Sequence, residues 1–282
     1  MKIQYDNHKK IFDNISKNKI DNSEFITSNE LTIDSWRQER IRSNIDPLCD
    51  EYKTKKWITL GDGKYGSDAI YISSKGVKNI IATDLNDTLL KISFQKKLIK
   101  KYSKQNAEKI KFSNQHFDIS LCKEAFHHFP RPILALYEML RISKEAVILI
   151  EPQDNLSLIN LFKNKYQFEE VGNFVYSLSI NEIEKIMMGI GLKSYAFKEI
   201  NDYYKEGIES ICTSDKSIKN KIIFYKFKTI ILIKDILVKL KIKKSNLITI
   251  VIFKHNPSDK LREKLLKSGY HIKNLPKNPY SN

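Results

Sequence analysis

A short apolar run that breaks into a glycine-rich turn constrains the fold of this chain most strongly. The run Trp57-Ile-Thr-Leu60 reads as a buried strand, and it enters a loop with three glycines before a helix expected over 67–75. A second apolar strand, 79–83, then ends on Asp84. Glycine lets a backbone approach a ligand closely, a helix N-terminus favours polar groups, and a carboxylate at this spacing accepts hydrogen bonds from ribose hydroxyls. Together these features predict a site for an adenosine-containing cofactor.

Apolar runs continue to alternate with amphipathic ones beyond this loop. We expect strands over 57–60, 79–83, 117–122, 146–151, 195–200 and 247–253, and helices over 67–75, 87–103, 132–141 and 181–190, the last with Ser179 as a possible cap. Nearly continuous apolar strands such as 146–150 are typical of a parallel sheet that is covered on both faces. The pattern therefore predicts an α/β fold with a doubly wound, mostly parallel sheet.

Composition narrows the class of protein. The formal charge of +16 on 282 residues suggests nucleic acid or a membrane as a partner, but nearly all the basic residues are lysines spread along the chain, which favours a solvated surface. Three distant cysteines without a CxxC pair, and scattered histidines, indicate a reducing cytoplasm and no metal site. The chain starts with polar residues, so no signal peptide is expected there. It has no apolar run of about 18 residues, so no membrane-spanning helix is expected either.

The chain divides into four expected regions: 1–54, a helical N-terminal cover or lid interrupted near Pro47; 55–202, the cofactor-binding core; 203–246, a basic helical insertion; and 247–282, the last core strand and a tail with one possible helix. Within the insertion, Lys219 to Lys244 mixes lysines with apolar residues. It is expected to pack on the core, with a membrane-resting surface or a closure over the substrate as alternatives.

The order of motifs resembles that of the class I S-adenosylmethionine-dependent methyltransferases of the type-11 group. Gly61-Asp-Gly-Lys-Tyr-Gly66 is similar to their glycine-rich motif, and Asp84 to their ribose-binding acid. The segments 106–112 and 116–128 resemble their adenine-contacting segment and their fourth strand with its histidine-bearing loop, and 146–152 resembles their fifth strand. The resemblance covers roughly 55–155 and implies a Rossmann-like sheet of seven strands.

From this resemblance we expect S-adenosyl-L-methionine as the cofactor and S-adenosyl-L-homocysteine as the product. The implied cofactor contacts are Gly61, Asp62, Gly63, Tyr65, Gly66, Asp84, Leu85, Asn106, Ala107, Cys122 and Lys123. The family usually has an acid where Thr59 stands here, so Asp62 is a candidate to replace it, and Tyr65 is expected at the mouth of the pocket. The rival class is a nicotinamide dehydrogenase, which lacks the segment at Asn106 and the paired histidines.

Methyl transfer to an alcohol requires a base, and histidine suits that role near neutral pH. Ligands gather at the carboxyl ends of the strands of an open sheet, so we expect one of His127 and His128 to face the site. His128 is the preferred base and Glu124 a possible assistant; the alternative is that both histidines are structural.

Acceptor contacts are expected from Trp36 and Arg40 on the N-terminal helix, from Arg131, and from Glu151 at the end of the fifth strand. The alternatives are that Trp36 belongs to an N-terminal helix packed on the sheet and that Arg131 lies exposed on the surface. The sequence shows no separate target-recognition domain, which argues against a nucleic-acid base as the acceptor. The resemblance implies a small acceptor, acidic or phosphate-bearing: a sugar, nucleotide-activated sugar or phosphoramidate precursor for bacterial capsule or surface polysaccharide. The alternatives are a lipid or quinone methyltransferase at a membrane and a non-catalytic cofactor-binding protein; the oligomeric state stays open.

Overall fold

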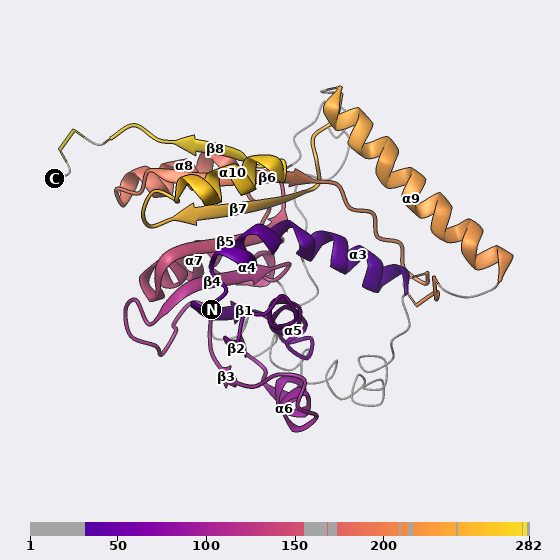
Figure 1. Cartoon of the computed structure of the whole chain (residues 1–282), viewed down its shortest axis with the longest axis horizontal. Helices are drawn as coiled ribbons and strands as arrows, with labels where there is room; N and C mark the ends of the chain where they lie inside the picture. The colour runs from indigo at the N-terminus through magenta and orange to yellow at the C-terminus, as the bar shows by residue number, and fades with distance from the viewer. Residues whose placement is uncertain are drawn as a thin grey trace.

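An eight-stranded sheet forms the centre of the described residues, which in this computed structural model are 32–154, 168, 174–208, 210–213, 217–240, 242–277 and 279–280 (Figure 1). In chain order the strands are β1 Lys56–Leu60, β2 Asn79–Asp84, β3 Tyr102–Lys104, β4 Phe117–Lys123, β5 Ser143–Pro152, β6 Ser194–Ile200, β7 Leu247–Phe253 and β8 His271–Asn274. They lie in the order β3-β2-β1-β4-β5-β7-β6-β8, parallel from β3 to β5 and antiparallel from β5 to β8.

Helices cover both faces of this sheet. Their bounds are α3 Ile33–Arg42, α4 Asp46–Glu51, α5 Ser67–Ser74, α6 Thr88–Gln95, α7 Pro132–Ile142, α8 Ile180–Gly189, α9 Ile218–Lys239 and α10 Asp259–Lys267, with 3-10 turns at Ser43–Ile45 and Phe126–His128. Helices α4, α5 and α10 share one hydrophobic core with the sheet, and α7 and α8 share the other. The predicted doubly wound α/β fold is confirmed.

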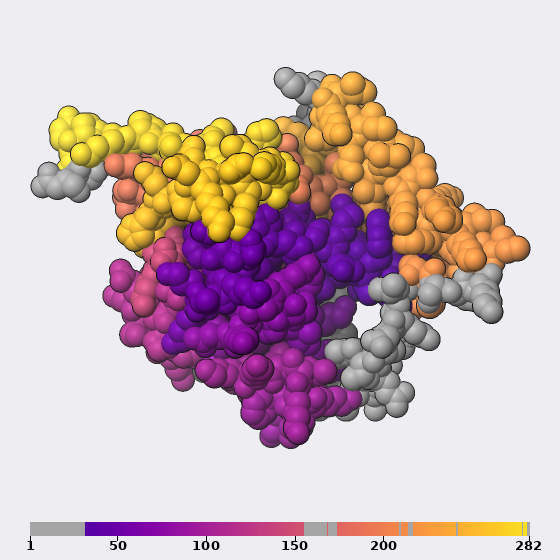
Figure 2. Space-filling view, viewed as in Figure 1, coloured from indigo at the N-terminus to yellow at the C-terminus, as the bar shows by residue number. Residues whose placement is uncertain are grey.

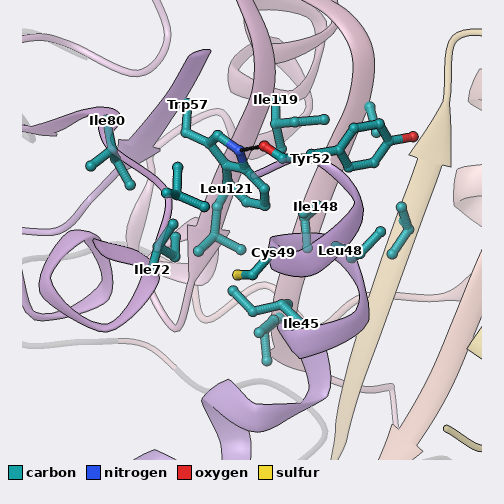
Figure 3. Close-up of a cluster of buried hydrophobic side chains, with 14 of the residues drawn as sticks. Ile45, Leu48, Cys49, Tyr52, Trp57, Ile72, Ile80, Ile119, Leu121 and Ile148 are labelled. Carbon is teal, nitrogen blue, oxygen red and sulfur yellow. Dashed lines mark hydrogen bonds between the residues drawn. The ribbon is translucent and has the colours of Figure 1, made fainter. Parts of the chain in front are cut away.

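The first core is built around the strand that precedes the glycine loop. Trp57 of β1 is fully buried, and Leu48 and Cys49 of α4 belong to the same cluster (Figure 3). The indole N–H of Trp57 donates to the carbonyl oxygen of Tyr52 at 3.0 Å, so the ring is satisfied although it has no access to water. This packing fixes the end of β1, from which the loop departs.

The expectation of a helix over 87–103 is wrong in its second half. Helix α6 ends at Gln95, Lys97 takes a left-handed conformation with φ 60°, and residues 102–104 form β3 beside β2. No glycine or proline marks this end, and the lysine-rich run continues the amphipathic pattern past it. Strand β3 is a three-residue edge strand with little buried surface, so its sequence shows no alternation of apolar and polar residues.

The tail also contains a strand that the pattern does not reveal. Helix α10 was expected, but strand β8, which pairs antiparallel with β6, was not. The sheet therefore has eight strands rather than the expected seven, and β8 replaces β7 as the last strand in the chain. Its side chains are mostly exposed, so the apolar alternation that predicts a strand is missing. The neighbouring Tyr270 is buried and donates from its hydroxyl to the carbonyl oxygen of Asn44, which ties the tail to the N-terminal helices.

Helix α9 lies in the chain between β6 and β7 and forms a ridge along one side of the molecule (Figure 2). A small cluster joins it to α3, with Ile33, Phe227 and Ile231 buried at its centre. Of the residues expected as an N-terminal cover, 1–31 lie outside the described residues, and α3 and α4 make up most of the rest. In the described part of the chain, no helix combines the length and the apolar character that crossing a membrane requires.

Candidate active site

The candidate site lies where the strand order reverses. Strand β1 pairs with β2 on one side and with β4 on the other, all three in parallel. Their carboxyl ends therefore meet at one edge of the sheet, at the switch point where open α/β sheets bind ligands. The glycine loop follows β1, Asp84 is the last residue of β2, and the segment after Lys123 follows β4.

The glycine loop, Gly61 to Gly66, needs its glycines for space as well as conformation. Gly61 has a φ of 70°, and a Cβ there would lie 2.3 Å from Cβ of Ala125 in the segment after β4. Gly66, with φ 71°, precedes α5. Tyr65 also takes the left-handed region, with φ 61°, and its ring is buried rather than placed at an open mouth as expected.

Asp84 lies directly against this loop. A Cβ on Gly63 would be 2.7 Å from the carboxylate carbon of Asp84, so only glycine leaves the carboxylate in place. The carboxylate accepts a hydrogen bond from the backbone N–H of Asn86 at 2.8 Å. Burial raises the pKa of Asp84 to about 6, against the opposing effect of backbone N–H groups that include that of Gly63. Leu85 follows it, partly buried.

Asp62 supports the loop from behind. Its carboxylate accepts hydrogen bonds from the backbone N–H groups of Asp68 and Ala69 in the first turn of α5, at 3.1 and 3.0 Å, and from the hydroxyl of Thr59 at 2.9 Å. Both oxygens are engaged inside the protein, so the expectation that this side chain replaces the family's acid toward the cofactor is wrong. Burial raises the pKa of Asp62, and the nearby Asp68 acts in the same direction.

A tight turn at Asn106 and Ala107 forms the other side of the site. The side-chain oxygen of Asn106 accepts from the backbone N–H of Glu108, and the backbone N–H of Gln105 donates to the carbonyl oxygen of Asp84. Buried Glu108 in turn accepts from the backbone N–H and from Nε of Arg131, both at 2.7 Å. Arg131 is exposed, with 44% of its side chain accessible, as the alternative reading expected, and its pair with the buried Glu108, which fixes this turn, was not predicted.

An alternating chain of charges runs behind the site, and we call it the ionic chain. Arg42 pairs with Asp68 at 2.7 Å, Asp68 lies 3.8 Å from Lys123, and Lys123 lies 2.8 Å from Glu124. The chain continues through Arg37 to Asp202 and ends at Arg40. Helix α3 is in this way tied to the carboxyl edge of the sheet.

The ionic chain changes the roles expected of two residues. Burial acts to raise the pKa of Glu124, but Lys123 and Arg37 outweigh it and lower the pKa to about 2, and Gln38 donates to the same carboxylate at 3.1 Å. Glu124 is therefore a fixed anion that faces α3, not an assistant to a base. Arg40 donates to the carbonyl oxygen of Asn201 and pairs with Asp202, so it is engaged structurally and does not await a substrate.

The loop after β4 is organised by Glu151 at the end of β5. One oxygen accepts from the backbone N–H groups of Ala125 and Phe126, each at 2.9 Å, and the other contacts Nδ1 of His127 at 2.7 Å. Glu151 is completely buried. The expectation that it faces the substrate is wrong, because its carboxylate is used to position the loop and the ring.

The remaining predicted residues lie close by in different settings. The rings of His127 and His128 lie 3.9 Å apart between centroids. Cys122 is fully buried with its thiol 3.8 Å from Glu151, so any contact it makes with a ligand is through its backbone. Trp36 packs edge-on against Phe224 of α9, 5.3 Å between centroids, so its ring belongs to the cluster that joins α3 to α9 and not to the packing on the sheet that the alternative reading expected.

This edge fits the cofactor that the resemblance implies. The loop has glycines where a side chain would collide with Asp84 or Ala125, and the half-buried carboxylate of Asp84 suits ribose hydroxyls. Several of the residues that shape the site were not predicted: Gln38, Arg42, Asp68, Glu108 and Asp202. The only sequence signal for them is the charge pattern on 34–42, because their partners are distant in the chain.

Comparison with known proteins agrees with this geometry. Residues 58–150 match the family model described as a methyltransferase domain. The chain is similar to the solved YcgJ protein of Bacillus subtilis, at 15% identity over 78% of this chain and 100% of that chain, with a TM-score of 0.51. It is also similar to an S-adenosylmethionine-dependent methyltransferase from Archaeoglobus fulgidus, at 13% identity over 77% and 94% of the two chains, with a TM-score of 0.50.

At these identities the two solved structures establish the fold alone, and comparison with curated proteins gives no match. The family-model match spans β1 to β5, the strands whose carboxyl ends carry the glycine loop, Asp84 and the histidine pair. That match assigns residues 58–150 to a methyltransferase domain, and the chain therefore carries an S-adenosylmethionine-dependent methyltransferase domain with S-adenosylmethionine as its cofactor.

Proposed function

We propose that the protein methylates a hydroxyl oxygen of a small acceptor, with His127 as the general base. The main observation in support of this proposal is the contact of 2.7 Å between Nδ1 of His127 and the buried carboxylate of Glu151. The pair lies beside the glycine loop, because the segment that bears His127 also packs Ala125 against Gly61. The preference for His128 made from the sequence gives way to its neighbour.

The cofactor supplies an electrophilic methyl group on a sulfonium, so the protein must mainly hold, align and deprotonate. Asp84 and the bare backbone at Gly63 would hold the ribose, and the turn at Asn106 and Ala107 would hold the adenine. Each of these groups is fixed by bonds within the protein, Asp84 through Asn86 and the turn through Glu108. Such preorganisation limits the loss of freedom when the ligand binds.

The proton of the acceptor hydroxyl is assigned to Nε2 of His127. A carboxylate only accepts hydrogen bonds, so Glu151 requires the proton of the neutral ring to be on Nδ1, which makes Nε2 the basic nitrogen. When the acceptor oxygen takes the methyl group, the bond from that carbon to sulfur would break with its electron pair left on sulfur, which gives the neutral thioether product. The hydroxyl proton would pass to Nε2 of His127, and Glu151 would stabilise the imidazolium. Glu151 is thus a positioning residue.

The acceptor class follows from the chemistry of the base and from the charge of the chain. A histidine base suits an alcohol, and a net charge of +16 favours anionic acceptors. We therefore place sugars, nucleotide-activated sugars and phosphoramidate precursors of capsule or surface polysaccharide first, in a bacterial cytoplasm. Quinone precursors and lipid headgroups are the alternative acceptors, and a non-catalytic cofactor-binding role is the alternative function.

A transfer assay with methyl-labelled S-adenosylmethionine tests the proposal. Nucleotide sugars and phosphoramidate precursors form one panel, and quinone precursors and lipid headgroups form the other. We expect turnover in the first panel that is lost in His127→Ala while affinity for S-adenosylhomocysteine is retained. Turnover confined to the second panel overturns the acceptor class, and cofactor binding without turnover in either panel favours the non-catalytic role.

A further inference from the structure

Helix α9 has two apolar faces, and only one of them is covered. On the inner face Phe227 and Ile231 are buried against α3 and the segment after β6. Lys234 reaches inward from this helix and donates to the carbonyl oxygen of Asp202 at 2.7 Å. The inner face therefore accounts for the attachment of α9 to the core.

The outer face carries a stripe of exposed apolar side chains. We call these residues the outer stripe: Ile218, Ile222, Tyr225, Leu232, Ile233, Ile236 and Leu240, each between 46% and 75% exposed. With Thr229 they follow one another at intervals of three, four or one residues, which keeps them on one side of an α-helix over its whole length. Single exposed apolar residues are ordinary, but a continuous row of this length marks an interaction surface.

Lysines border the outer stripe on both sides. At 3.6 residues per turn, Lys219 and Lys226 fall along one margin, and Lys221 and Lys239 fall along the other. All four are exposed. The one carboxylate in the sequence of α9, Asp235, lies toward the core, where it accepts from the side-chain amide of Asn201 at 2.8 Å.

We propose that the outer stripe of α9 adsorbs to an anionic membrane surface, with the helix axis in the plane of the interface. Helices that lie in membrane interfaces combine an apolar stripe with flanking lysines, and the apolar side chains enter by about 5–10 Å while the lysines meet lipid phosphates. Long lysine side chains extend from the margin of the stripe to the headgroups without burying their charge.

Charge complementarity selects this occupant over a second copy of the chain. Two α9 helices facing each other would bring together lysine margins without acids to pair with them, in a protein of net charge +16. Nucleic acid would meet the lysines but would leave the apolar row without a partner, since the stripe has a single aromatic ring, Tyr225, on which a base could stack.

Adsorption would also orient the catalytic core. The inner face of α9 meets α3 through Trp36, whose ring lies edge-on to Phe224, and Lys228 lies 4.4 Å from the centroid of the same Phe224 ring. Helix α3 in turn carries the arginines of the ionic chain. The membrane would therefore lie against the outer face of α9, on the opposite side of that helix from α3. The proposal does not depend on which acceptor is methylated.

Vesicle co-sedimentation with the full chain tests the proposal. Vesicles of phosphatidylcholine with phosphatidylglycerol are compared with vesicles of phosphatidylcholine alone, at low and at high salt. We expect the partition coefficient to be at least about tenfold higher on the anionic vesicles and to fall with salt. Equal partition on the two kinds of vesicle, or no partition at low salt, overturns the proposal.

Variants with matched controls separate the stripe from the general charge. Ile222→Ser with Ile236→Ser removes two stripe residues, and Lys219→Glu with Lys226→Glu reverses one margin; each pair is expected to lower the partition coefficient about tenfold. The controls are exposed residues elsewhere, Leu266→Ser and the pair Lys260→Glu with Lys277→Glu, expected to stay within about twofold of wild type. Equal losses in the controls overturn the proposal.

Two further measurements show whether a loss of vesicle binding in the stripe variants comes from misfolding or from a change in self-association. Affinity for S-adenosylhomocysteine should be unchanged in the stripe variants, since their side chains are exposed and distant in the chain from the glycine loop. Sedimentation equilibrium without lipid should give the same mass for wild type and stripe variants. A wild-type dimer that the stripe variants convert to a monomer, without vesicle binding, assigns the stripe to a second copy instead.

Discussion

Glu151 and His127 form a hydrogen-bonded pair in which the carboxylate is fully buried and the ring lies at the edge of the site, 2.7 Å between Oε2 and Nδ1. The second carboxylate oxygen accepts two backbone N–H groups of the loop that carries the ring. One side chain thus sets both the path of the loop and the position of the ring proton.

His127→Ala should lower kcat by about 10²- to 10⁴-fold, because removal of a general base has effects of this size. Affinity for S-adenosylhomocysteine should stay close to that of wild type. The matched control is His128→Ala, which removes the adjacent ring and should cost less than about tenfold. The measurement is steady-state transfer of labelled methyl to the acceptor found in the screen. A larger loss in His128→Ala would reverse the assignment of the base.

Glu151→Gln tests the tautomer. The amide keeps one acceptor oxygen for the backbone N–H groups but turns a donor toward His127, which moves the ring proton to Nε2. We expect kcat to fall nearly as far as in His127→Ala, and nitrogen NMR of the ring to report the changed tautomer. A variant with normal kcat and an unchanged tautomer would show that the pair has no part in proton transfer.

Gly63→Ala should weaken the binding of S-adenosylhomocysteine roughly tenfold to a hundredfold, since the new methyl group displaces Asp84 and overpacking costs about 1–3 kcal/mol. The expected contact of 2.7 Å leaves no room for adjustment without moving the carboxylate. Gly189→Ala is the control, because a Cβ at that position meets nothing within 4 Å. Calorimetric titration of both variants checks the prediction, and equal affinities would contradict it.

Cofactor affinity should depend on pH through Asp84. Its pKa is raised to about 6, so the carboxylate is ionised above that pH and protonated below it. A protonated group loses acceptor capacity for ribose hydroxyls, and affinity should therefore fall as the pH drops from 7 toward 5, with the midpoint near 6. The same raised pKa makes the ionised form unfavourable to folding, so the stability linked to Asp84 is present at low pH and lost as the pH rises through about 6.

Calorimetry at several pH values measures this dependence, and Asp84→Asn should bind weakly with no midpoint near pH 6. A midpoint that persists in Asp84→Asn would assign the titration to another group, with Asp62 the first candidate, since burial also raises its pKa.

Arg37→Met should destabilise the protein by roughly 3 kcal/mol, because it leaves Glu124 and Asp202 with fewer partners in a buried setting. The stability that Glu124 contributes is present above its ordinary pKa and lost as the pH falls toward its folded value of about 2, and the variant should move this loss to higher pH. Denaturant unfolding at several pH values measures both effects. Lys267→Ala, which breaks an exposed pair with Glu263, should change stability by less than about 1 kcal/mol.

The sequence predicts the parts of the structure that depend on local pattern. The strands at 57–60 and 247–253, the glycine loop and the position of Asp84 all follow from apolar runs and turn residues, and each lies where it was expected. The strands β3 and β8 do not, because short exposed edge strands leave almost no hydrophobic alternation to detect.

The side-chain network of the site could not be predicted, because it joins residues that are distant in the chain. Glu151 meets His127 across 24 positions, and Arg42 meets Asp68 across 26. Asp62 lies in the expected loop, but its carboxylate turns into α5, and nothing in the loop sequence distinguishes that direction from the opposite one. The sequence therefore predicts that these side chains lie at the carboxyl edge of the sheet, but the contacts of each side chain depend on tertiary packing.

The two outermost strands, β3 and β8, also determine how the sheet ends. They have three and four residues, and each presents a lysine, Lys104 and Lys273, to solvent. A short, charged margin offers few unpaired backbone groups to a strand from another molecule. Lateral growth of the sheet into a fibre or a strand-swapped pair is thereby discouraged, although the four central strands β1, β4, β5 and β7 are almost wholly buried.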